Sequence, residues 1–292
     1  DVAGAFAAAD VVLRQSYRSQ RYTGVPMEPR ACLAQYDAGT DTLTLWTTTQ
    51  IPHLIRSGVA EALGFPENRL RVVSPDVGGG FGVKASLYPE EVLLPYLARR
   101  LDRPVRWIAD RSEDFLASIH AREHRHSLAL AARQDGTILG LEARIVVDAG
   151  AYSPWPWTAA MEIGIAAGNL PGPYQIQNYS FEALSVCTNK MPIGAYRGVA
   201  RPAACFSIER AVDDLARELG LDPLAVRERN LIDTYPYTTV TGLEIDSGSL
   251  LPALHRVREV LNYDALRAEQ AAARQEGRLV GIGIANYTEQ TA

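Results

Sequence analysis

The chain has 292 residues, of which 47% are hydrophobic and 22% are charged, and its formal net charge at pH 7 is −5. A chain of this size holds one large globular domain or two ordinary ones, and it has no basic block or basic-aromatic pattern that would indicate a nucleic-acid partner. No apolar run reaches the roughly 18 residues that a membrane span requires, and no signal peptide is visible.

The first third of the chain mixes strand and helix signals. No element is assigned to residues 11–22, where a short apolar stretch is followed by polar residues. A helix is expected from Pro52 to Leu63, because apolar residues recur there at helical spacing and Gly64 follows. Alternation and β-branched or aromatic residues predict strands at 31–36, 43–48, 70–73 and 105–108. The strands on either side of the helix should pair in parallel, through a right-handed β-α-β unit.

A second helix is expected from Tyr88 to Leu101, with a kink at Pro95. Residues 124–133 and 137–147 alternate and flank Asp135-Gly136, which predicts a hairpin. Residues 150–180 are rich in glycine, proline and aromatic residues, and they are expected to form a long loop.

Helices dominate the last third. One is expected over residues 203–219 and another from Pro223, capped by Asp222. Residues 233–248 are expected to be loop and residues 250–276 to hold two further helices. Because strands and helices do not alternate regularly, the expected class is α+β, with mixed sheets and packed helices.

Both ends suggest that residues 1–292 are part of a larger unit. The chain begins at Asp1 rather than at a methionine. It ends on an alternating pattern at 281–287, and a strand there would need a partner edge. We therefore expect a fragment of a longer polypeptide or a subunit that assembles with a second chain.

The three cysteines, Cys32, Cys187 and Cys205, are isolated and form no C-x-x-C pair. This argues against an iron-sulfur cluster or a zinc site within the chain. Unpaired cysteines suit a reducing compartment, so a cytoplasmic location is expected. No nucleophile motif is present.

The segment Gly78-Gly79-Gly80-Phe81-Gly82 follows a predicted strand and precedes Lys84. Glycines permit positive φ and close backbone approach, so their N–H groups can converge on an anion or an oxo group. The spacing fits neither the Walker loop, since Ala85 follows Lys84, nor the dinucleotide fingerprint. The alternative is a tight structural turn.

Two further features are candidate binding residues. Gln50 stands at the end of a predicted strand, where its side-chain amide could donate to a ligand oxygen; the alternative is a helix-capping or surface glutamine. Arg197 and Arg201 lie among small residues in the segment 194–202 and could approach an anion closely. The alternative is an arginine that pins a loop through carbonyl hydrogen bonds.

Histidines 120, 124 and 126 form a small cluster. His124 and His126 would share one face of a strand, which makes a metal pair geometrically possible. Arg122 and Arg125 are interspersed and no carboxylate completes a ligand set, so an exposed or partly buried polar face is the preferred interpretation.

Three segments, in this order and spacing, resemble the molybdenum hydroxylases, which comprise the large subunits of xanthine dehydrogenase, aldehyde oxidase and aerobic carbon monoxide dehydrogenase. The segments are WTTTQIPH at 46–53, GGGFGVK at 78–84 and AYRG at 195–198. The segments PYTT at 236–239, DSG at 246–248 and YDALR at 263–267 are most similar to the carbon monoxide dehydrogenase-like branch. The resemblance runs from about residue 15 to the end.

The resemblance implies the first half of a duplicated molybdopterin-binding region, with a hammerhead-like domain upstream and the second half downstream. The cofactor would be molybdopterin with molybdenum, in the cytosine dinucleotide form usual in bacteria. Its dithiolene holds the metal, so no side chain of this chain would be a metal ligand. Gln50 would be the catalytic residue, through a hydrogen bond to a molybdenum ligand. The implied cofactor-binding residues are Gly79, Gly80, Phe81, Gly82 and Arg197.

The resemblance also implies hydroxylation with water as the oxygen source, and transfer of electrons to iron-sulfur and FAD-containing partners. Three departures qualify it. The family's base glutamate lies downstream of this chain, so activity of the chain alone is not expected. Purine oxidisers carry Glu where Ala85 stands, and carbon monoxide oxidisers carry Cys where Gly198 stands. An aldehyde or an N-heterocycle is therefore the expected substrate, and the alternative is a non-catalytic, glycine-rich anion-binding module without molybdenum.

Overall fold

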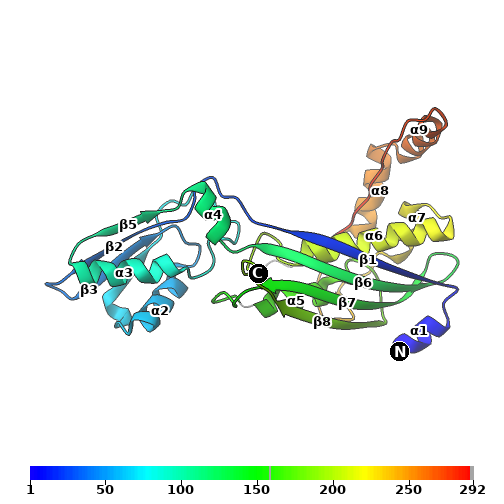
Figure 1. Cartoon of the computed structure of the whole chain (residues 1–292). Helices are drawn as coiled ribbons and strands as arrows, with labels where there is room; N and C mark the ends of the chain where they lie inside the picture. Colours follow the sequence, from blue (N-terminus) through cyan, green and yellow to red (C-terminus); the bar gives the residue numbers. More distant parts are fainter. Residues whose placement is uncertain (158, 290–292) are drawn as a thin grey trace.

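The computed structural model describes residues 1–157 and 159–289 and contains two four-stranded sheets (Figure 1). The smaller sheet has the order β4-β3-β2-β5. Its strands are β2 (Ala31–Asp37), β3 (Thr42–Thr47), β4 (Leu70–Val73) and β5 (Val105–Ile108). Helices α2 (Pro52–Leu63) and α3 (Pro89–Leu101) pack on it, and a short 3-10 turn, Glu67–Arg69, precedes β4.

The larger sheet has the order β1-β6-β7-β8. Its strands are β1 (Val11–Tyr22), β6 (Ala121–Ala132), β7 (Ile138–Gly150) and β8 (Tyr179–Cys187). The first three strands pair antiparallel and β8 joins β7 in parallel. Helices α5 (Ala159–Asn169) and α6 (Arg201–Leu219) contact this sheet and each other, and together they bury the larger hydrophobic core.

Short elements connect and extend these layers. Figure 1 shows α4 (Arg111–Ala117) at the junction of the two sheets and the pair α8 (Leu250–Val260) and α9 (Tyr263–Gln275) projecting from the larger one. The remaining elements are α1 (Val2–Ala7), α7 (Pro223–Asn230), β9 (Tyr237–Thr238) and β10 (Glu244–Ile245). Within the described residues, no helix combines the length and apolar character that a membrane crossing needs.

Most expected elements are confirmed, and so is the mixed α+β class. The strands β3 and β4 on either side of α2 are parallel, and α2 ends at Gly64 with a left-handed φ of +57°. The hairpin turns at Asp135-Gly136 between β6 and β7. Asp222 caps α7 through a hydrogen bond to the Leu224 N–H. Pro95 lies buried within α3, which continues to Leu101.

Two expectations were wrong, for residues 150–180 and 281–287, and the unassigned residues 11–22 form a strand. Residues 11–22 form the long strand β1, whose polar residues lie along an edge that β6 pairs on one side only. Residues 150–180 are not a continuous loop, because α5 occupies 159–169 and β8 begins at Tyr179; residue 158 lies outside the described residues. Alanine and glycine in α5 hide its helical periodicity. Residues 281–287 form no strand, and Ile282 and Ile284 pack against the larger core instead.

Candidate functional site

The structure brings the three sequence segments together. Gln50 follows β3, the glycine segment 78–82 follows β4, and Arg197 lies in the loop before α6. The side chain of Gln50 accepts a hydrogen bond from the Gly82 N–H at 2.8 Å. The backbone N–H of Arg197 donates to the Phe81 carbonyl at 3.0 Å. Segments separated by more than 100 residues therefore form one continuous surface.

Gln50 is fixed by its backbone and points its amide at the glycine segment. Its N–H donates to the Lys84 carbonyl at 2.9 Å. It does not cap α2, because the N-cap is Ile51. Its Oε1 accepts the hydrogen bond from the Gly82 N–H, whereas its amide NH2 group has no partner among the described residues. An exposed amide donor thus remains available beside the cradle.

The glycine segment needs glycine at its two closest contacts. A Cβ added at Gly80 would lie 2.4 Å from Gln50 Oε1, and one at Gly82 would lie 2.5 Å from the backbone carbonyl oxygen of Ala195. Positive φ occurs at Gly79 (+98°), Phe81 (+55°) and Gly82 (+95°). Within the described chain, the N–H groups of Gly80 and Phe81 donate no hydrogen bond. Two backbone donors are therefore free at the surface of this turn.

Arg197 is exposed, and its guanidinium forms no ion pair with any residue in the described ranges. The expected alternative, an arginine that pins the loop through carbonyls, applies instead to Arg122. Arg122 Nε donates to the Val199 carbonyl at 2.8 Å, and its Nη2 contacts the Arg197 carbonyl. Its guanidinium lies over the rings of Tyr22 and Tyr196, 4.9 and 5.0 Å from their centroids. Arg197 is thereby left free for a ligand.

Sequence reasoning missed Arg122 as a site residue, because it stood between the histidines and in no motif. The backbone is left-handed at Arg122 (φ +61°) and at Glu123 (φ +80°), but this is visible in the structure and not in the sequence. Arg122 is buried, and burial lowers its pKa from the ordinary value of an arginine. Val199, which Arg122 holds, is a β-branched residue at φ +51°, a conformation that such a residue seldom adopts.

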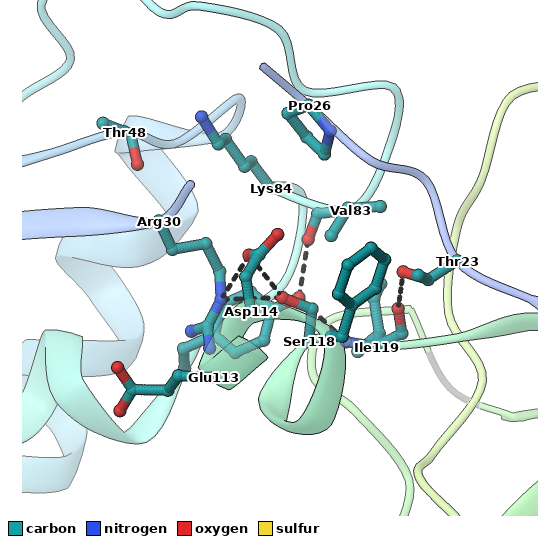
Figure 2. A network of polar contacts seen from close by, with 12 residues as sticks. Thr23, Pro26, Arg30, Thr48, Val83, Lys84, Glu113, Asp114, Ser118 and Ile119 are labelled. Atoms are coloured by element: carbon teal, nitrogen blue, oxygen red, sulfur yellow. Dashed lines mark hydrogen bonds and ion pairs between the residues drawn. The ribbon is translucent and has the colours of Figure 1, made fainter. Parts of the chain in front are cut away.

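A second buried arginine supports the glycine side of the site (Figure 2). Arg30 donates from Nε to Ser118 Oγ at 3.0 Å, and Ser118 donates to Asp114 at 2.9 Å. The guanidinium of Arg30 lies 3.7 Å from the centroid of the Tyr88 ring, and the hydroxyl of Tyr88 donates to the Val83 carbonyl at 2.7 Å. This network fixes α4 against the end of the glycine loop.

The histidine interpretation was wrong about burial. His124 and His126 are each 1% exposed, and they contact each other at 3.1 Å between Nδ1 and Nε2. Glu162 of α5, which the sequence did not connect to them, lies 3.1 Å from His124 Nε2. Burial is the main cause, and the neighbouring His124 a smaller one, of a pKa of His126 that is lowered to about 3. No group of three His, Cys, Asp or Glu in the described residues could hold a metal ion.

Two free backbone donors, a free amide and an unpaired arginine lie on adjoining segments and form a candidate site for an anionic or oxo-bearing group. The chain belongs to the molybdopterin cofactor-binding domain family, whose model matches residues 1–231. The resemblance to molybdenum hydroxylase large subunits is confirmed.

Several named proteins are similar to it. The chain is 39% identical over 292 residues to the nicotine 6-hydroxylase large subunit of Paenarthrobacter nicotinovorans, covering 100% of this chain and 36% of that protein. It is 39% identical to the carbon monoxide dehydrogenase large chain of Hydrogenophaga pseudoflava, over 97% of this chain and 36% of the other. Quinoline 2-oxidoreductase from Pseudomonas putida 86 matches in structure with a TM-score of 0.90 and 41% identity, over 95% of this chain and 36% of that one.

The chain thus spans about a third of the length of these relatives. The residues present fit a molybdopterin. Its phosphate and its metal-bound oxygen atoms accept hydrogen bonds, and the site offers the N–H groups of Gly80 and Phe81, the amide of Gln50 and the guanidinium of Arg197. A side chain at Gly80 or Gly82 would fill the close contacts that shape this surface.

Proposed function

We propose that this chain supplies the molybdopterin-binding wall of a molybdenum hydroxylase that oxidises an N-heterocycle or an aldehyde, with water as the source of oxygen. The observation that carries the proposal is the junction of Gln50, the glycine segment and Arg197 by direct hydrogen bonds. Residues from three distant segments leave their unused donors on one surface. A structural turn alone would account for the glycines but not for the free amide and arginine beside them.

Each residue has a separate task in this proposal. Gln50 would donate its free amide N–H to a ligand of the metal, while its Oε1 still accepts from the Gly82 N–H. The N–H groups of Gly80 and Phe81 would hold acceptor oxygens of the cofactor, and Arg197 would contribute positive charge near its anionic part. When bound, the molybdenum cofactor supplies the redox centre at which the substrate carbon is hydroxylated. The residue that takes up the proton is expected in the downstream part of the large subunit.

Two positions support the substrate class. Ala85 is buried and carries no charge, where purine oxidisers of the family carry Glu. Gly198 has φ +84°, and an added Cβ would lie 2.9 Å from the Pro202 ring, so the backbone there disfavours the cysteine of carbon monoxide oxidisers. The relatives named nicotine 6-hydroxylase and quinoline 2-oxidoreductase act on N-heterocycles by their names. These points favour an N-heterocycle other than a purine over purines and carbon monoxide.

The proposed assembly includes the rest of the large subunit, iron-sulfur and FAD-containing partners, and the cytosine dinucleotide form of the cofactor. We expect it in the cytoplasm, where the free cysteines Cys32, Cys187 and Cys205 would stay reduced. The test is oxidation of quinoline, nicotine and an aromatic aldehyde by the complete complex in ¹⁸O-labelled water. Label in the hydroxylated product supports the proposal. Absence of turnover on all three substrates by a molybdenum-loaded complex would refute the substrate class.

A further inference from the structure

One carboxylate holds both ends of the glycine loop. Glu28, between β1 and β2, donates its backbone N–H to the Gly78 carbonyl at 3.1 Å. Its side-chain Oε2 accepts from the Gly78 N–H at 2.8 Å and from Lys84 Nζ at 2.8 Å. A Cβ added at Gly78 would lie 2.7 Å from Glu28 Cβ, so glycine is what permits the approach. The loop from 78 to 84 is therefore closed through a single residue.

Lys84 is the buried member of this pair. Its side chain is 1% exposed, whereas that of Glu28 is 36% exposed. A buried ammonium requires a counter-charge, and within the described residues Glu28 is the carboxylate paired with it. The backbone of Lys84 is equally committed, because its carbonyl accepts from the Gln50 N–H at 2.9 Å and from Thr49 Oγ1 at 3.2 Å. The position of Lys84 thus couples Glu28 to Gln50.

The pKa of the Glu28 carboxyl is held below its ordinary value. Burial by itself would raise the pKa of Glu28, but the hydrogen bonds from Lys84 and from the Gly78 N–H outweigh it and hold that pKa below its ordinary value. The carboxylate therefore stays ionised and acts as an acceptor for both groups.

We propose that Glu28 and Lys84 are positioning residues for the molybdenum cofactor, which they hold indirectly by fixing the two ends of the glycine loop. The inference rests on the proposed function of that loop. If Glu28 loses its charge, Lys84 is left buried without a partner and must leave its site. Its carbonyl then moves away from Gln50, and the N–H groups of Gly80 and Phe81 lose their fixed positions.

The test uses the complete complex expressed with its partner chains. Glu28→Gln keeps an acceptor for the Gly78 N–H and removes only the charge. Lys84→Met keeps the stem in its buried slot and leaves Glu28 partly solvated. The double variant Glu28→Gln/Lys84→Met removes both charges together, so a direct coupling between the residues appears as partial rescue.

A matched control separates positioning from general stability. Glu209 on α6 and Arg227 on α7 form another buried ion pair, at 2.8 Å and with side chains 6% and 0% exposed. Arg227 also pairs with Asp213 at 2.8 Å, and the other side-chain partners of the pair are Tyr174 and the Pro223 carbonyl rather than the glycine loop. Glu209→Gln should lower the unfolding temperature without changing cofactor retention below that temperature. The measured quantities are molybdenum and pterin per chain, the rate of pterin release, and amide hydrogen exchange of residues 78–84 in cofactor-free complex.

Glu28→Gln and Lys84→Met are each expected to release the cofactor about tenfold to a hundredfold faster than wild type. Faster exchange at residues 78–84 should accompany the release, and the double variant should recover part of the loss. Wild-type retention in both single variants, or an equal loss in Glu209→Gln, would overturn the positioning role. Absence of molybdenum from the wild-type complex would instead refute the proposed function, and the exchange experiment would still report whether the pair orders the loop.

Discussion

Gly82 is the position where a single methyl group tests the geometry of the site most severely. Its φ is +95°, outside the range that L-residues favour, and an alanine Cβ there would lie 2.5 Å from the Ala195 carbonyl oxygen. Real Cβ atoms essentially never show contacts below 3.0 Å, and the opposing atom is backbone, which cannot rotate away. The segments 78–82 and 194–198 must therefore separate in Gly82→Ala.

The cost has two parts. Backbone strain at such a φ costs about 1–3 kcal/mol. Overpacking against a fixed neighbour adds about 1–3 kcal/mol. Gly64→Ala isolates the first part, because Gly64 has φ +57° and nothing lies within 4 Å of its added Cβ; its cost is expected at about 1–2 kcal/mol.

The assay compares the two variants in the assembled complex, by thermal unfolding and by pterin retained per chain. Gly64→Ala should lower the unfolding temperature slightly and retain wild-type pterin. Gly82→Ala should unfold at a lower temperature than Gly64→Ala and lose most of its pterin, because separation breaks the hydrogen bond between Phe81 and Arg197. Identical behaviour of the two variants would show that the glycine and arginine segments are not in contact as described.

The remaining predictions concern the ligand side and its supports. Gln50→Ala and Arg197→Ala should each lower turnover by about a hundredfold while the unfolding temperature stays near wild type, since both side chains are exposed; full activity in both would remove them from the site. Arg122→Lys should lower turnover about tenfold, because one ammonium cannot replace the guanidinium that contacts the Arg197 and Val199 carbonyls. Arg125 is exposed, and Arg125→Lys should match wild type. Equal effects of the two substitutions would show that Arg122 does not hold these carbonyls in place. The pKa of His126 is about 3 in the folded protein and its ordinary value is 6.5, so the unfolded chain binds a proton that the folded one does not. The free energy of unfolding should therefore fall by up to about 1.4 kcal/mol per pH unit as the pH drops from 6 to 4, and equal slopes for wild type and His126→Phe in chemical unfolding would contradict this assignment.

The elements that the sequence predicts well are those with a local physical signature. α2 has Pro52 at its start, a regular apolar stripe and Gly64 at its end, and the hairpin has Asp135-Gly136 at its turn. Strand β1 and helix α5 lack such signatures. The edge position of β1 allows polar residues at most of its positions, and α5 is built from small residues that pack on β7, β8 and α6.

The candidate site divides in the same way. Gln50, the glycine segment and Arg197 stand out because they lie in three segments whose order and spacing resemble the motifs of the molybdenum hydroxylases. Glu28 and Arg122 do not stand out, because their tasks depend on contacts with Gly78, Lys84 and the 197–199 carbonyls that only the folded chain creates. The burial of His124 and His126 was likewise not predictable, because Glu162, which contacts His124, lies in α5, a helix that the sequence does not reveal.

The molybdenum and pterin content of the intact complex tests the central claim most directly. Metal analysis and pterin release would be measured per copy of this chain, after assembly with the partner subunits. The account predicts stoichiometric molybdenum and pterin in wild type, with both reduced in Gly82→Ala and retained in Gly64→Ala. A properly assembled complex that contains neither would leave a glycine-rich anion-binding module in place of an enzyme and would contradict the account.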